Sequence, residues 1–206
     1  MRTGVVIMSN IVWTHHFIST SQREQKQKHR SGVFWFTGLS GAGKTTLAML
    51  LEKTLFDMHK NICVLDGDNV RLGINKDLGF SSDDRSENIR RAAELSKIMA
   101  RQGCIVIVSL ISPAAHDRQL AREIIGENFF EIFINADLDV CIDRDTKGLY
   151  AKALKGEIEG FTGVGSPYDV PLLPDLVVNT AEISIEESNN LLLDFILSRT
   201  VGALSC

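Results

Sequence analysis

The sequence of 206 residues has little that would indicate a membrane, secreted or nucleic-acid-binding protein. No apolar run approaches the roughly 20 residues that a transmembrane helix needs. The apolar stretch Val5–Met8 is too short for the core of a signal peptide. The formal net charge of −4 provides no basic excess for binding nucleic acid. We therefore expect a soluble, cytoplasmic protein, whose translation starts at either Met1 or Met8.

Cysteine is also scarce, and its spacing excludes two common uses. Cys63, Cys104, Cys141 and Cys206 match neither the spacing of zinc ligands nor that of a redox-active pair. Cys63 and Cys104 lie in apolar runs, where cysteine usually behaves as a small buried hydrophobic residue. This distribution is compatible with a reducing compartment.

Five short apolar runs alternate with helical patterns along the chain. The runs are continuous, which is typical of parallel strands covered on both faces. They predict strands at 33–36, 62–65, 104–110, 129–135 and 176–178. The spacing of apolar residues predicts helices at 45–58, 86–101, 114–125 and 185–197. The alternation predicts an α/β fold with a doubly wound, five-stranded parallel sheet and helices on both faces.

Two long stretches, 69–85 and 147–174, interrupt this regular pattern. Loops of this length inside a compact domain are usually functional. Both follow the C-terminal ends of expected strands, where open α/β sheets bind ligands. We expect them to supply a lid and an acceptor pocket to a single domain at 32–206. A lead-in at 1–31 would precede it, with a loosely packed polar part at 15–31.

A phosphate-binding pattern follows the first expected strand. Gly38, Gly43, Lys44 and Thr45 satisfy G-x-x-x-x-G-K-[ST], and an expected helix follows them. The glycines let backbone N–H groups surround the phosphates, the lysine reaches the β- and γ-phosphates, and the threonine can hold Mg²⁺. This P-loop of an NTPase-type fold predicts ATP binding by Gly38, Ser40, Gly41, Ala42, Gly43, Lys44, Thr45 and Thr46.

Two carboxylates and an arginine follow the second expected strand. Asp66, Asp68 and Arg71 would surround the γ-phosphate and an acceptor hydroxyl. A carboxylate there can orient the nucleophile, accept its proton or hold a metal through water. The alternative is a turn in which the aspartates only cap backbone N–H groups, and the pattern alone favours neither interpretation. The short single domain and the lack of an N-K-x-D motif favour a small-molecule kinase over a GTPase.

A longer series of segments runs in order along the chain: FTGLSGAGKTT (36–46), LDGDNVR (65–71), DLGFSSDDRSENIRR (77–91), ISP (111–113), KGLYAKA (147–153) and GEIEGFTGVGSPYDVP (156–171). This series resembles the adenylylsulfate kinase family, which phosphorylates the 3′-hydroxyl of adenosine 5′-phosphosulfate. The resemblance implies a P-loop kinase that uses ATP and Mg²⁺ and forms 3′-phosphoadenylyl sulfate for sulfate assimilation. It also implies a homodimer and functional coupling to sulfate adenylyltransferase.

The resemblance further implies an acceptor site. Phe80 and Phe161 would stack on the adenine, while Arg71 and Arg85 would pair with phosphosulfate or ribose oxygens. The full set implied is Asp68, Asn69, Arg71, Phe80, Arg85, Asn88, Ile111, Ser112, Lys147 and Phe161. After ISP this chain has residues 114–116 as AAH, whereas the family usually has an aromatic residue and then an arginine, so a basic contact near the pocket is expected to be absent.

The catalytic set implied by the resemblance is Lys44, Asp66, Asp68, Ser112 and Lys147. Asp68 would orient or deprotonate the 3′-hydroxyl, Asp66 would join Thr45 at Mg²⁺, and Lys147 would neutralise the transferring phosphate. Family descriptions name the serine at position 112 as a phosphoserine intermediate. We favour direct in-line transfer instead, because a pocket built for it needs no relay.

Two other functions stay open at this level. One is another small-molecule kinase of the same fold, acting on a nucleotide or a sugar acid. The segments LDGDNVR and GFTG argue against it. The other is a nucleotide-binding regulatory domain that partners sulfate adenylyltransferase without turnover. The presence of Lys44, Thr45, Asp66 and Asp68 argues against a broken active site.

Overall fold

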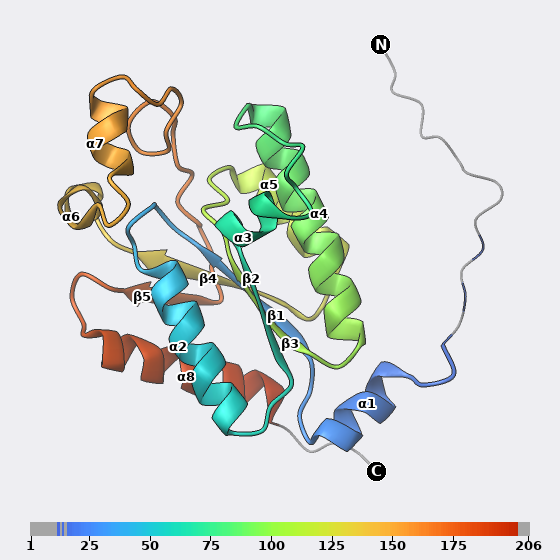
Figure 1. Ribbon diagram of the computed structural model, residues 1–206. Coiled ribbons are helices and arrows are strands. Elements are labelled where there is room, and N and C mark those ends of the chain that lie inside the picture. The colour runs from blue at the N-terminus through green and yellow to red at the C-terminus, as the bar shows by residue number, and fades with distance from the viewer. Residues whose placement is uncertain (1–11, 13, 15, 202–206) are drawn as a thin grey trace.

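The computed structural model describes Val12, Thr14 and residues 16–201, which form an α/β fold around a parallel sheet (Figure 1). The five strands have the order β2-β3-β1-β4-β5. They are β1 (Gly32–Thr37), β2 (Ile62–Asp66), β3 (Ile105–Ser109), β4 (Phe129–Asn135) and β5 (Leu176–Asn179). The five predicted strands are confirmed, with ends that differ by at most one residue.

Helices cover both faces of the sheet, as predicted. α2 (Lys44–Asp57) and α8 (Ile185–Thr200) lie on one face, and α4 (Ser82–Arg101) and α5 (Ala115–Ile125) lie on the other (Figure 1). Within the described residues, no helix is both long and apolar enough to cross a membrane.

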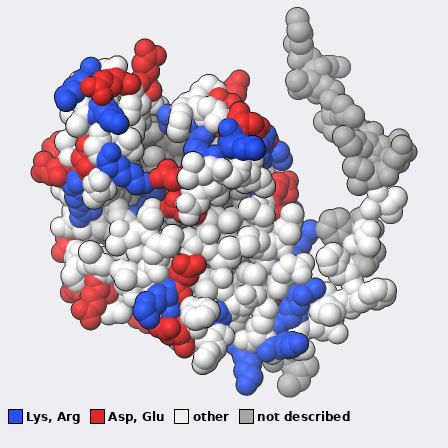
Figure 2. Space-filling model, viewed as in Figure 1, with Lys and Arg blue, Asp and Glu red and all other residues white. Residues whose placement is uncertain are grey.

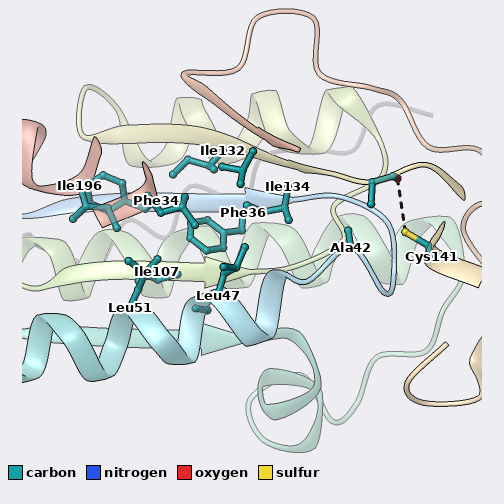
Figure 3. Packing of buried hydrophobic residues seen from close by; sticks show 14 of the residues in the cluster. Phe34, Phe36, Ala42, Leu47, Leu51, Ile107, Ile132, Ile134, Cys141 and Ile196 are labelled. Atoms are coloured by element: carbon teal, nitrogen blue, oxygen red, sulfur yellow. Dashed lines mark hydrogen bonds between the residues drawn. The ribbon is translucent and has the colours of Figure 1, made fainter. Parts of the chain in front are cut away.

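The central strand β1 shows why two helical layers form. Its side chains alternate between the two faces, as in any strand, and all six of its residues are buried. Phe34 and Phe36 pack with α2 and α8 in one core cluster (Figure 3). Val33 and Trp35 pack with α4 and α5 in the other. Because both faces are buried, the strand is apolar without interruption, which explains the continuous pattern in the sequence.

Capping side chains account for one helix that the sequence pattern began too late and for another that it missed. α4 begins at Ser82 rather than Ser86 because the Ser81 hydroxyl accepts a hydrogen bond from the backbone N–H of Asp84. The carboxylate of Asp66 caps α3 (Gly67–Leu72) in the same way. Two further short helices, α6 (Leu138–Arg144) and α7 (Leu149–Leu154), begin and end within what the sequence showed only as irregular chain.

The described part of the lead-in is more ordered than predicted. It contains α1 (Thr20–Gln27), and the residues after this helix are attached to the domain. The buried His29 ring accepts a hydrogen bond from the backbone N–H of Asn61 at 3.0 Å, and Arg30 N–H donates to Thr200 O at 2.7 Å. The expectation of loose packing is therefore wrong for His29–Ser31, whereas α1 itself has no buried residue. Residues 1–11, 13 and 15 lie outside the described residues, and the domain boundary at 31/32 stays a prediction.

Candidate active site

The loop between β1 and α2 is held against the end of β4, and glycine is required for this fit. Gly38 has a φ of 150°, and a Cβ atom there would lie 2.2 Å from the carbonyl oxygen of Ile134. Gly41 has a φ of 79°, and a Cβ there would lie 2.9 Å from the carbonyl oxygen of Cys141. Side chains at these positions would force the backbone apart. The wrapped shape of the loop therefore depends on glycine at these two positions.

Lys44 lies inside this loop. Its ammonium group donates hydrogen bonds to the carbonyl oxygens of Gly38 at 2.8 Å and Leu39 at 2.7 Å. Burial lowers the pKa of Lys44 to about 8. An anion beside a buried ammonium favours its charged form, so a bound phosphate would raise this pKa again.

Thr45 and Asp66 form the part of the site suited to a metal ion. The Thr45 hydroxyl donates to Asp66 Oδ2 at 2.8 Å, while Oδ1 of Asp66 accepts the N–H of Asp68 at 3.1 Å. Asp66 is thus both a helix cap and a pocket residue: the capping interpretation is confirmed for it, and its role at a metal ion stays a prediction. Among the described residues, no group of three or more His, Cys, Asp or Glu side chains could hold a metal by itself. One hydroxyl and one carboxylate fit Mg²⁺, which is commonly bound by few protein oxygens together with phosphate oxygens and water.

A pocket of about 370 Å³ opens above the loop. Figure 2 shows this edge of the molecule hollowed between the segment that carries α6 and α7 and the N-terminal part of α4, with basic and acidic side chains nearby. The predicted ATP-binding residues that line it are Ser40, Gly41, Gly43, Lys44, Thr45 and Thr46. Gly38 and Ala42 do not line it. Gly38 instead accepts from Lys44, and Ala42 packs in the core (Figure 3).

The polar residues of this pocket that were not predicted from the sequence include Ser109, Arg144 and Thr180. The Thr180 hydroxyl donates to Ala42 O at 2.8 Å, and Arg144 Nη2 donates to Thr180 O at 2.7 Å. These contacts join the phosphate loop to α6 and to the end of β5. None of the three belongs to a local motif, so no sequence signal marks them.

A smaller pocket of about 140 Å³ adjoins the first and contains most of the predicted acceptor residues. Those lining it are Asp68, Arg71, Phe80, Arg85, Asn88, Ile111, Ser112 and Phe161. Lys147 lines the larger pocket, and Asn69 lines neither. Asp68 and Ile111 line both pockets, so the two cavities meet at these side chains.

Arg71 and Arg85 shape the smaller pocket through contacts with the two long loops. The Arg71 guanidinium lies 4.5 Å from the centre of the Phe80 ring and donates to Gly79 O at 2.7 Å. Arg85 donates to Phe80 O at 2.9 Å, and across the pocket to Thr162 Oγ1 at 2.9 Å and to the carbonyl oxygen of residue 160 at 2.8 Å. Arg85 therefore joins both long loops.

The catalytic pair predicted at the junction is also brought together. Lys147 donates a hydrogen bond to Oδ2 of Asp68, and both side chains are more than half exposed. The contact connects the chain just before α7 to α3 across the opening between the pockets. Phe161, by contrast, is buried, with its ring edge-on to Tyr150 at 5.0 Å between centres.

Ser112 lies on the floor of the smaller pocket in an uncommon conformation. Its φ is 40°, which non-glycine residues rarely adopt. The Trp35 indole donates to its hydroxyl at 3.1 Å, and the residue is buried. His116, after the turn, has an exposed side chain 3.1 Å from Asp117 and does not line either pocket.

Comparisons with known proteins agree with this arrangement. The family model for adenylylsulphate kinase matches residues 30–179. The adenylyl-sulfate kinase of Bacillus pumilus (strain SAFR-032) is 51% identical over 193 residues, which cover 92% of this chain and 98% of the relative. That of Shewanella amazonensis (strain ATCC BAA-1098 / SB2B) is 47% identical over 192 residues, covering 93% and 97%. The structure of the Mycobacterium tuberculosis APS kinase in complex with AMPPNP and APS superposes with a TM-score of 0.79 at 47% identity, over 82% of this chain and 98% of that one. The chain therefore belongs to the adenylylsulphate kinase family.

Proposed function

We propose that this protein transfers the γ-phosphoryl group of ATP to the 3′-hydroxyl of adenylylsulfate, giving 3′-phosphoadenylyl sulfate and ADP. The observation that carries the proposal is the meeting of two pockets at Asp68, with the phosphate loop in one and the aromatic and arginine residues in the other. The names of the relatives, and the AMPPNP and APS bound to the Mycobacterium tuberculosis enzyme, support it.

The larger pocket would hold ATP. Its phosphates would lie on the loop, where Lys44 exchanges two backbone carbonyls for phosphate oxygens. The purine would extend toward Ile183 and Ile185, two apolar residues that line the same pocket. Thr45 and Asp66 would hold Mg²⁺, which when bound neutralises charge on the phosphates.

The smaller pocket would hold adenylylsulfate. Phe80 and Phe161 would contact the adenine, and Arg71 and Arg85 the anionic groups. All three guanidinium nitrogens of Arg85 donate to loop atoms. Its contact with the ligand would therefore replace contacts that now join the loops, which couples acceptor binding to the position of residues 160–162.

Asp68 and Lys147 would act at the reacting atoms. Lys147 would leave Asp68 and move to the transferring phosphoryl group, which frees a carboxylate oxygen to orient the 3′-hydroxyl. Because the transition state is loose, proton transfer to Asp68 can come late, and positioning carries more of the catalysis. Direct transfer fits Ser112, whose buried hydroxyl is already engaged by the Trp35 indole.

The decisive experiment is an assay of ADP release with ATP, Mg²⁺ and adenylylsulfate. We expect release to depend on adenylylsulfate and to be lost in Lys44→Ala. The matched control is Lys53→Ala, on the same helix, whose exposed side chain pairs with Asp57. ADP release at a rate that does not depend on adenylylsulfate would contradict the proposal. A panel of other nucleotides and sugar acids tests the second kinase function, and nucleotide binding without turnover would support the regulatory one.

We further propose, from the family resemblance, that the protein is a cytoplasmic homodimer coupled functionally to sulfate adenylyltransferase, with 1–31 contacting the second subunit. Cys63, Cys104 and Cys141 are free thiols, which suits a reducing compartment. Sedimentation velocity at several concentrations tests the assembly, and a monomer throughout would contradict it.

A further inference from the structure

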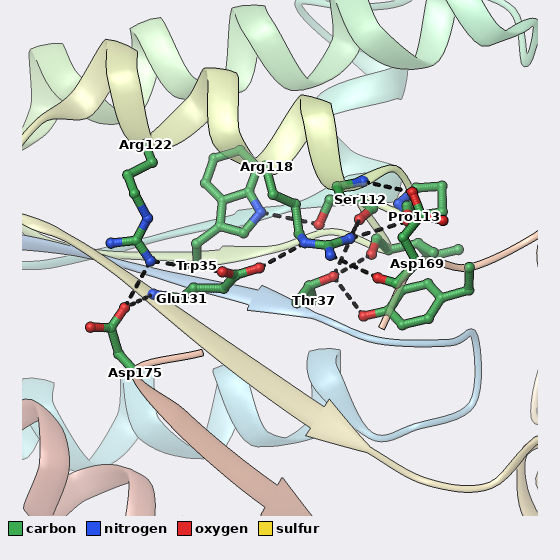
Figure 4. Close-up of polar contacts among 12 residues, drawn as sticks. Trp35, Thr37, Ser112, Pro113, Arg118, Arg122, Glu131, Asp169 and Asp175 are labelled. Carbon is green, nitrogen blue, oxygen red and sulfur yellow. Dashed lines mark hydrogen bonds and ion pairs between the residues drawn. The ribbon is translucent and has the colours of Figure 1, made fainter. Parts of the chain in front are cut away.

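A buried arginine outside both pockets connects the two segments that build the acceptor pocket. The side chain of Arg118, on α5, is only 4% exposed. Its Nη1 donates to the carbonyl oxygens of Ser112 at 2.8 Å and Pro113 at 3.1 Å, and its Nη2 donates to Asp169 O at 2.7 Å (Figure 4). It therefore binds three backbone carbonyls that come from two parts of the chain.

The charge of Arg118 is balanced within the same cluster. Its Nε donates to Glu131 Oε1 on β4 at 2.7 Å, and that glutamate is itself only 13% exposed. Burying a cation is costly unless it is paired and its donors are all used. Each nitrogen of this guanidinium has an acceptor. Glu131 on β4 therefore orients the guanidinium from one side, and the three backbone carbonyl oxygens orient it from the other.

The two segments that Arg118 joins both reach the acceptor pocket. Ser112 and Pro113 line it directly, and the chain that ends at Asp169 carries Phe161 and Thr162, which line its other side. Backbone contacts reinforce the connection. Asp169 N–H donates to Pro113 O at 2.9 Å, and Ala115 N–H donates to the Asp169 carboxylate at 2.9 Å.

The backbone of Ser112 has an unfavourable conformation that surrounding contacts must maintain. A non-glycine residue at φ 40° persists only where surrounding contacts over-determine it. Those contacts are the Trp35 indole on its hydroxyl and two donors on its carbonyl oxygen, Arg118 at 2.8 Å and the Thr37 hydroxyl at 3.3 Å. Removing the guanidinium would leave the Ser112 carbonyl with only the longer bond from Thr37 and the Pro113 carbonyl without its bond from Arg118, which would loosen this side of the pocket.

From this geometry we infer that Arg118 is a positioning residue of the acceptor site: it holds residues 112–113 against the segment that ends at Asp169 and so sets the shape of the pocket for the phosphoryl acceptor. The inference rests on the proposed function for its substrate. Arg118 itself lines neither pocket. Its guanidinium places a cation close behind the acceptor pocket, on the carbonyl oxygens of Ser112 and Pro113.

The test separates positioning from charge balance. Arg118→Met alone leaves Glu131 buried without its main partner, so the informative variant is Arg118→Met with Glu131→Gln. We expect its kcat/KM for adenylylsulfate to fall by about ten- to a hundredfold, because small misplacement of a reactant has effects of this size. The Kd of a non-hydrolysable ATP analogue should change by less than about twofold. Arg118→Lys keeps a positive charge beside Glu131 but lacks the branched guanidinium. Its kcat/KM for adenylylsulfate should lie between that of the double variant and that of the unmodified protein.

The matched control is Arg122→Met, one turn further along α5, where the side chain is 37% exposed, pairs with Asp175 at 3.0 Å and with Glu131 at 3.7 Å, and contacts neither segment that Arg118 joins. Its kcat/KM should stay within about twofold of the unmodified protein. A double variant with a normal kcat/KM for adenylylsulfate would overturn the inference, and so would a loss equal to that of the control.

Hydrogen exchange provides a readout that needs no substrate. The amides of Ala115 and Asp169 should exchange at least about tenfold faster in the double variant than in Arg122→Met, because local opening sets exchange rates. Equal exchange would contradict the inference whether or not the protein phosphorylates adenylylsulfate. Lack of adenylylsulfate-dependent turnover in the unmodified protein would contradict the proposed function instead.

Discussion

The hydroxyl of Thr45 and Oδ2 of Asp66 are 2.8 Å apart and share a hydrogen bond that joins the first turn of α2 to the end of β2. Asp68, two residues further along, has no such contact with α2 and pairs with Lys147 instead. Two neighbouring carboxylates thus have separate surroundings, one beside the phosphate loop and one at the junction of the pockets.

This separation predicts different defects in two variants. Asp66→Asn should raise the Mg²⁺ concentration for half-maximal activity by about tenfold or more, because it removes a charged oxygen ligand. Asp68→Asn should lower kcat and leave the Mg²⁺ requirement within about twofold. Titration of activity with Mg²⁺ measures both. A larger shift in Mg²⁺ requirement for the Asp68 variant would mean that the roles are reversed.

The lowered pKa of Lys44 predicts how nucleotide affinity depends on pH. Below a pH of about 8 the free lysine is charged and the affinity for ATP should be at its full value. As the pH rises through about 8 the free lysine loses its proton, whereas a bound phosphate keeps it charged. Binding should then take up a proton, and affinity should fall by up to about tenfold per pH unit. Calorimetry in two buffers of different ionisation enthalpy measures this uptake. Lys44→Arg should abolish the proton uptake, since arginine stays charged. An unchanged proton uptake in this variant would mean that another group takes up the proton.

Ser112→Ala tests the route of the phosphoryl group. Direct transfer predicts that kcat stays within about tenfold of the unmodified protein and that acid quenching during turnover finds no phosphate attached to the protein. The change should lower the free energy of unfolding by about 1–3 kcal/mol, because the buried Trp35 indole loses its acceptor. Complete loss of turnover in a folded variant would instead favour a phosphoserine intermediate.

Phe80 and Phe161 share a predicted role but differ in burial, and their variants should differ accordingly. Phe161→Ala should lower the free energy of unfolding by about 3–5 kcal/mol, since the ring is 9% exposed and packs on Tyr150. Phe80→Ala should leave stability nearly unchanged, since that ring is 70% exposed, and should raise the KM for adenylylsulfate. Urea unfolding and steady-state kinetics measure the two effects. A normal KM for the Phe80 variant would remove that ring from the acceptor site.

The sheet was predictable because its strands are buried on both sides and therefore continuous in hydrophobicity. The short helices were not, because a six-residue helix such as α3 is fixed by one capping side chain rather than by a repeated apolar pattern. The lead-in helix was missed for a related reason. α1 has no buried residue, so its apolar spacing carries no signal.

The phosphate loop and its carboxylates were predictable because their chemistry requires neighbouring residues. Residues brought in from a distance were not. Thr180 donates to the carbonyl oxygen of Ala42, 138 residues away in sequence, and Arg118 donates to that of Asp169, 51 residues away. Such contacts depend on the assembled sheet, and a single arginine or threonine in a helix or loop gives no indication of them.

Since Gly38 fits closely beneath the carbonyl of Ile134, the loss of backbone entropy in the phosphate loop is incurred once, during folding. Each round of nucleotide binding then orders mainly the nucleotide and the Lys44 side chain. The loop serves as a rigid template, and more of the contact energy with the triphosphate is available as affinity.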